Sequence, residues 1–156
     1  MNEQMNEQIY NKMNLLKKAF IILLAFDFIG LVLASTTIFP TFKQLSGYGT
    51  LMLVIASIIV AVIIAIMLFE ILAKVFLIRS TSSTFDWSSG RKGYLTVAKF
   101  LLFFNLLTIV VNVLSIGGEG ATLLNQGRLY LEILLSIIEA IATFLYLRTV
   151  KKLNMA

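Results

Sequence analysis

The chain has 156 residues, of which 59% are hydrophobic and 13% are charged, and its formal net charge is +5. Soluble domains are roughly 45–50% apolar and about a quarter charged, so this composition predicts a protein of the lipid bilayer. The sequence contains neither histidine nor cysteine. Their absence excludes disulfides, zinc–thiolate sites, histidine-ligated haem and every nucleophile that a histidine would activate, and we expect no metal and no cofactor.

Four long apolar stretches dominate the sequence, at residues 19–39, 51–78, 95–116 and 129–147. An α-helix needs about 20 apolar residues to cross a hydrocarbon core of about 30 Å, and each stretch meets that length. The connections between them are short and rich in glycine, serine and threonine, which favours antiparallel neighbours. We therefore predict an all-α integral membrane protein, a four-transmembrane-helix antiparallel bundle.

This bundle would form one domain, residues 19–148, between an N-terminal extension (1–18) and a basic tail (149–156). The first apolar stretch also admits a second interpretation. Lys17 and Lys18 before an apolar run are typical of a secretory signal peptide, with a small-residue cleavage zone near Ala34. However, the run is long, it contains Asp27, and no clean A-x-A motif follows. We expect it to be retained as the first helix, with cleavage as the alternative.

Lysine and arginine fall mainly on one side of the predicted membrane. Nine of them lie at the ends that would share a side: Lys12, Lys17, Lys18, Arg79, Arg91, Lys92, Arg148, Lys151 and Lys152. The opposite ends carry only Lys43 and Arg128. Because basic residues stay on the cytoplasmic side, both termini are predicted to be cytoplasmic. The positive charge then indicates contact with anionic lipid on that side and not with nucleic acid.

Small and polar residues recur at helical spacing in each stretch and predict the faces that look into the bundle. In membranes such residues mark helix–helix contacts, because large apolar side chains are equally at home in lipid. The predicted faces are Asp27, Gly30, Ala34 and Thr37; Ser57, Ala61 and Ala65; Asn105, Thr108, Asn112 and Ser115; and Glu132, Ser136, Glu139, Thr143 and Tyr146.

Asp27 and Glu139 are predicted to lie about 12 Å deep, and Asn105 about 15 Å deep, from the rise of an α-helix. The three could meet near the middle of the bilayer. Charge at that depth costs at least about 2.5–3.5 kcal/mol, which makes these residues functional candidates. In one interpretation the carboxyls are protonated, hydrogen-bonded and structural. In the other they form a carboxylate pair that binds and releases a proton or a cationic ligand.

Three further charged residues, Glu70, Lys74 and Lys99, complete the predicted intramembrane polar cluster. Glu70 precedes Lys74 by one turn, which is the favourable order for an ion pair. Lys74 and Lys99 lie close enough to the inner boundary that we expect them to act as anchors, with their ammonium groups extended to the interface. At the opposite boundary, Glu132 follows Arg128 by four residues, and we expect a surface pair there.

The segment 79–94 is the longest predicted cytoplasmic connection, and Phe85, Asp86 and Trp87 are its most distinctive residues. Aromatic rings at a membrane border usually lie at the level of the lipid headgroups, and we expect that placement. The alternative is a docking loop, in which Phe85 and Trp87 anchor a cytoplasmic partner and Asp86 supplies specificity.

No catalytic motif with the required residues is present, and we predict that the chain is not an enzyme. A lipid enzyme using the carboxylate of Asp27 or Glu139 is the remaining enzymatic alternative. We expect a non-enzymatic accessory, immunity or regulatory protein that packs against a membrane partner in a bacterial cytoplasmic membrane. The bacterial origin is inferred from the frequent use of lysine, asparagine and isoleucine.

The alternative function is a proton- or cation-coupled transporter or channel subunit, with Asp27 and Glu139 as its intramembrane carboxylates. Small multidrug transporters also have four helices and an acid in the first of them, which Asp27 matches in outline. This chain is longer and its fourth stretch carries further acids, so membership of that family is not inferred. Four helices are few for a transport path, so this function would require a homo-oligomer.

Overall fold

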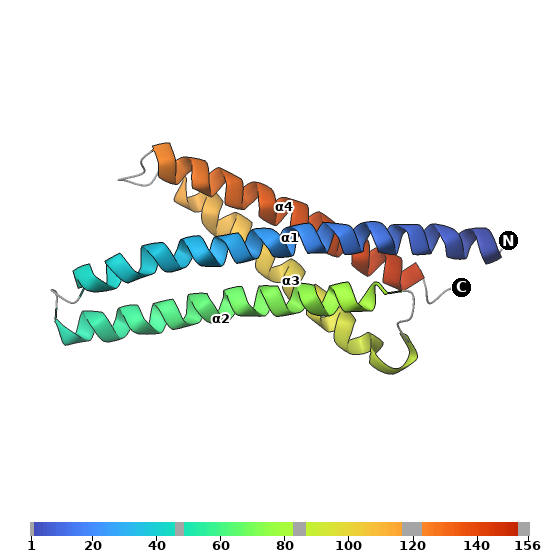
Figure 1. Ribbon diagram of the computed structural model, residues 1–156, viewed down its shortest axis with the longest axis horizontal. Coiled ribbons are helices and arrows are strands. Elements are labelled where there is room, and N and C mark those ends of the chain that lie inside the picture. The colour runs from blue at the N-terminus through green and yellow to red at the C-terminus, as the bar shows by residue number, and fades with distance from the viewer. Residues whose placement is uncertain (1, 46–48, 83–86, 117–122, 153–156) are drawn as a thin grey trace.

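Four α-helices make up the computed structural model, which describes residues 2–45, 49–82, 87–116 and 123–152. Side chains are described for residues 7–33, 49–82, 92–116 and 126–152. The helices are α1 (Asn2–Leu45), α2 (Thr50–Ser80), α3 (Trp87–Ser115) and α4 (Leu123–Lys152). Figure 1 shows that consecutive helices run in opposite directions. The prediction of an all-α fold is confirmed.

Three of the four helices are long and apolar enough to cross a membrane, judged over the described residues: Thr50–Ser80, Lys92–Ser115 and Gln126–Lys152. All four helices begin before their apolar stretch, and α1, α2 and α4 also end after it. The largest difference is in α1, which includes most of the predicted N-terminal extension. Hydropathy marks the segment that prefers lipid, whereas helical hydrogen bonding continues into polar flanks that water can solvate.

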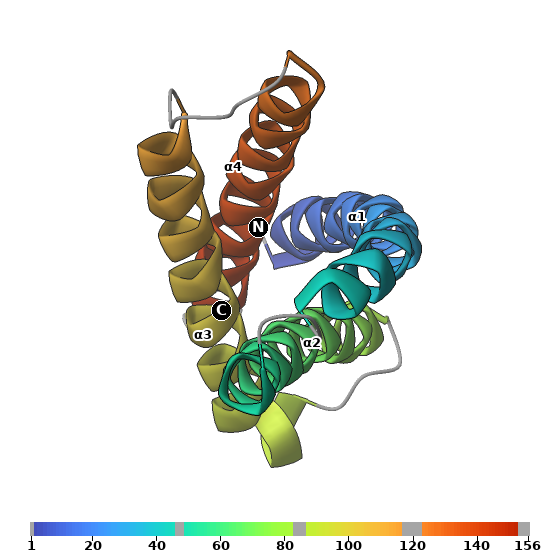
Figure 2. The ribbon, with the colours of Figure 1, turned by 90° about the vertical axis from the view of Figure 1, so that its left-hand side faces the viewer.

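The helices pack in a ring, in which α1 contacts α2, α2 contacts α3, α3 contacts α4, and α4 closes the ring on α1. The contacts are most extensive between α3 and α4 and between α1 and α2, so the protein consists of two hairpins. The start of α1 and the end of α4 lie at the same end of the bundle, which we call the terminal end (Figure 1). The two hairpins cross, and they separate toward the opposite end, the far end (Figures 1 and 2).

The apolar core lies in the half of the bundle nearer the terminal end. On α1 its residues recur every three or four positions: Ile9, Met13, Leu16, Phe20 and Leu23. This spacing places them in one row that faces the other helices. Leu77, Leu101 and Val150 complete the core from α2, α3 and α4, and each is fully buried. Asp27 and Gly30 continue the row of α1 toward the far end and are partly buried.

The predicted interior faces of α3 and α4 agree with the structure in large part. On α4, Ser136, Glu139, Thr143 and Tyr146 are all buried. On α3, Asn105 and Asn112 are buried and Thr108 is partly buried, whereas Ser115 is exposed. The side chains of Ala34 and Thr37, predicted for α1, lie outside the described residues.

The predicted interior face of α2 is wrong, because Ser57, Ala61 and Ala65 are all exposed. The partly buried residues in this part of α2 are Leu53, Ala56 and Val60. Ala56 and Val60 each precede a predicted residue by one position, which rotates the face by about 100°. The Ser57 hydroxyl donates a hydrogen bond of 2.7 Å to the Leu53 carbonyl of its own helix. Ser57 therefore needs no partner on another helix.

Candidate functional site

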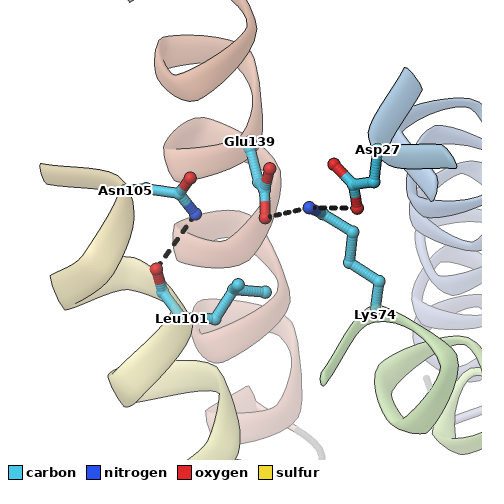
Figure 3. A network of polar contacts seen from close by, with 5 residues as sticks. All are labelled: Asp27, Lys74, Leu101, Asn105 and Glu139. Atoms are coloured by element: carbon cyan, nitrogen blue, oxygen red, sulfur yellow. Dashed lines mark hydrogen bonds and ion pairs between the residues drawn. The ribbon is translucent and has the colours of Figure 1, made fainter. Parts of the chain in front are cut away.

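Lys74 lies at the centre of a charged layer across the bundle. Its side chain is fully buried, and Nζ lies 2.6 Å from Asp27 Oδ2 and 2.8 Å from Glu139 Oε1 (Figure 3). The prediction that Lys74 extends to the membrane interface is therefore wrong. Two carboxylates from two other helices satisfy the ammonium inside the bundle, so it gains nothing from reaching the boundary.

Each of the four helices contributes one side chain to this layer. Asp27 comes from α1, Lys74 from α2 and Glu139 from α4, while Asn105 of α3 lies beside Glu139 (Figure 3). The Asn105 amide donates a hydrogen bond of 3.0 Å to the carbonyl of Leu101. The sequence predicted that Asp27, Asn105 and Glu139 meet, and the structure brings them together around Lys74. We refer to these four residues as the charged layer.

The charged layer contains more negative than positive charge. Two carboxylates contact a single ammonium, so the fully ionised layer would hold one negative charge in excess. Glu70, one turn before Lys74, is partly buried and interacts electrostatically with Lys74, Glu139 and Asp27. An excess charge in a low-dielectric interior is costly, so the layer has a physical reason to take up a proton or another cation.

Two predicted members of the cluster take other positions. Within the described residues, the ion pairs of Lys74 are with Asp27 and Glu139, and the predicted pair with Glu70 is not formed. The ammonium is directed across the bundle, away from its own helix (Figure 3). Lys99 is exposed on α3 and does not join the charged layer.

A second polar contact lies between the charged layer and the terminal end. The hydroxyls of Ser80 and Tyr146 are 2.6 Å apart, and both side chains are fully buried. The Ser80 hydroxyl donates to the Leu77 carbonyl at 2.7 Å, which leaves Tyr146 as the donor to Ser80. Phe20 packs edge-on against the Tyr146 ring, with centroids 6.1 Å apart. Ser80 is not among the residues predicted from the sequence, although it follows Lys74 and Leu77 at intervals of three residues.

A third polar group lies toward the far end, where Arg128 Nε donates to Glu132 Oε1 at 2.8 Å. This confirms the predicted surface pair, in which the Arg128 side chain is exposed and the Glu132 side chain is partly exposed. The Asn112 amide also donates to Glu132 Oε2 at 3.3 Å, so Glu132 links α4 to α3. Such an exposed pair contributes little stability, on the order of 0–1 kcal/mol.

The predicted docking loop cannot be placed, because Phe85 and Asp86 lie outside the described residues and the Trp87 side chain does as well.

No group of three metal-binding side chains occurs among the residues that the structure describes. No protein-family model, curated protein or solved structure matches the chain.

Proposed function

We propose that the chain crosses the cytoplasmic membrane of a bacterium four times, with both termini in the cytoplasm. The distribution of lysine and arginine supports this orientation. The start of α1 and the end of α4 share the terminal end, which fits an even number of crossings (Figure 1). In this arrangement the basic terminal end faces anionic lipid headgroups of the inner leaflet.

We further propose that the protein is a non-enzymatic accessory, immunity or regulatory protein that packs against another membrane protein. The observation that carries this proposal is the exposed row of small residues on α2, Ser57, Ala61 and Ala65. Small residues four positions apart let two helix backbones approach closely in lipid. The charged layer supports the same function, because its charged groups bind one another and stabilise the bundle.

Site-specific photo-crosslinking in the native membrane tests this proposal. A photoreactive residue at Ala61 should capture one membrane protein of different sequence, identified by mass spectrometry. The matched control is Ile63, which is also exposed and lies about 160° away around the helix. Capture of the same protein equally from both positions, or of lipid alone from Ala61, would contradict a specific contact at the small-residue row.

A second function is favoured by one observation, the excess of carboxylates around Lys74. A proton- or cation-coupled transporter or channel subunit needs an intramembrane group that exchanges its cation, and Asp27 and Glu139 would be that group. Purified protein should then release protons when a transported cation is added. The doubly neutral variant with Asp27→Asn and Glu139→Gln should release none. A homo-oligomer without a second protein would favour this function over the accessory one.

A further inference from the structure

The two hairpins contact each other mainly in the half of the bundle near the terminal end. Two ring contacts join the hairpins there. The rings of Phe76 and Tyr94 stack with their centroids 3.8 Å apart, and the ring of Phe20 packs against that of Tyr146. The charged layer lies nearer the far end, at the level of the contact between the rings of Phe69 and Phe104. Beyond it the hairpins separate (Figures 1 and 2). Lys74 therefore lies close to the place where the hairpins part.

The two ion pairs of Lys74 differ in what they join. Asp27 and Lys74 belong to α1 and α2, which form the first hairpin. Glu139 belongs to α4, so its pair with Lys74 links the first hairpin to the second. We propose that the Lys74–Glu139 pair is a latch between the hairpins, which a proton on Glu139 opens and ionisation of Glu139 closes.

Opening this latch does not leave a buried charge unpaired. Once Glu139 is protonated, Lys74 keeps Asp27 as its partner, and the excess negative charge among the three residues disappears. Asn105 lies beside Glu139, where its amide hydrogen-bonds the carboxylate. One turn along α4, the fully buried hydroxyl of Thr143 has no hydrogen-bond partner among the described residues. The proton comes from water, and the reaction is a simple protonation of the carboxylate.

Charged groups on two other helices act on the protonation of Glu139. Asp27 faces it from α1, Glu70 and Lys74 face it from α2, and the described part of α3 contributes the uncharged amide of Asn105. The two other carboxylates favour protonation of Glu139, whereas the ammonium of Lys74 and the hydrogen bond from Asn105 oppose it. Because acidification adds a proton to Glu139, it should weaken the link between the hairpins and leave the pair within the first hairpin in place.

Distances between spin labels test the latch, and the absence of native cysteine makes every label site unambiguous. Val62→Cys on α2 and Leu131→Cys on α4 report the separation of the hairpins, and both native side chains are about half exposed. Val110→Cys with Leu131→Cys reports the distance within the second hairpin and serves as the folding control. The full chain is measured in bilayers of phosphatidylethanolamine and phosphatidylglycerol, at neutral and mildly acidic pH.

In the otherwise native protein we expect the distance between Val62 and Leu131 to lengthen and its distribution to broaden on acidification. Glu139→Gln, and Glu139→Met without an oxygen acceptor, should show the longer distance at both pH values. Asp27→Asn is the matched control, since it also removes one carboxylate from Lys74 but should keep the short distance at neutral pH. An unchanged native distance on acidification would overturn the proposal, and so would equal lengthening in Asp27→Asn and Glu139→Gln.

Discussion

Lys74 and Glu139 join two helices whose backbones are not neighbours in the ring. Their charged atoms are 2.8 Å apart, although α2 is flanked by α1 and α3, and α4 by α3 and α1. Only a long side chain from one helix can bridge this diagonal, and the four-carbon stem of lysine does so. The same ammonium contacts Asp27 at 2.6 Å. One residue thus connects three of the four helices.

Replacing Lys74 should destabilise the bundle strongly. Lys74→Met keeps the length of the side chain but removes the charge, which leaves Asp27 and Glu139 close together without a counter-ion. Removal of one partner from a buried ion pair costs about 3–5 kcal/mol, and we expect a loss of this size in the free energy of unfolding. Reversible unfolding in mixed detergent and lipid, followed by circular dichroism, measures it.

Two variants make this result specific. The triple variant Asp27→Asn, Lys74→Met and Glu139→Gln removes all three charges and should recover most of the lost stability, because no unpaired charge remains. Lys99→Met removes an exposed lysine from α3 and should change the stability by less than about 0.5 kcal/mol. A loss in Lys74→Met no larger than that in Lys99→Met would show that the buried pair contributes no stability.

Much of the charged layer could be anticipated from the sequence, but its centre could not. Helical spacing correctly placed Asn105 and Glu139 inside the bundle, since polar residues at depth avoid lipid. The prediction for Lys74 is wrong because a lysine near the membrane boundary can reach either water or the interior with the same stem. Its choice depends on the rotation of α2, and that rotation depends on packing partners from other helices. A single sequence does not contain this information.

The hydroxyl pair of Ser80 and Tyr146 should be coupled energetically. Tyr146→Phe removes the donor of a buried hydrogen bond without leaving a cavity, and we expect a cost of about 0.5–1.5 kcal/mol. Ser80→Ala should cost a similar amount, and the double variant should cost less than the sum of the two. A double-mutant cycle of unfolding free energies measures the coupling. Strict additivity would contradict the hydrogen bond at 2.6 Å.

Two alanines on different helices should respond differently to a larger side chain. Ala98 of α3 is fully buried, and Ala98→Leu should cost about 1–3 kcal/mol because the added atoms have no room. Ala61 of α2 is exposed, and Ala61→Leu should change the unfolding free energy by less than about 0.5 kcal/mol. If Ala61→Leu destabilises the isolated protein as much as Ala98→Leu, the orientation of α2 described above is incorrect.

The rotation of α2 also shows why small residues alone are an ambiguous signal. They predict where helices approach closely, whether the neighbouring helix belongs to the same chain or to another one. On α4 the small and polar residues Ser136 and Thr143 face the chain's own core. On α2 the small residues Ser57 and Ala61 face outward. The pattern is the same at the level of sequence, and only the packing of the helices distinguishes the two.

The proposed orientation in the membrane can be measured with single cysteines, since the native chain has none. Lys152→Cys lies at the terminal end of α4 and should be protected from a membrane-impermeant thiol reagent in intact cells. Gly127→Cys lies near the far end of the same helix, with no atom close to the position of its new Cβ, and should be labelled. Both should be labelled after the membrane is permeabilised.

The reverse pattern in intact cells would place the termini outside, against the lysine and arginine distribution. Labelling of both cysteines in intact cells would mean that α4 does not cross the membrane.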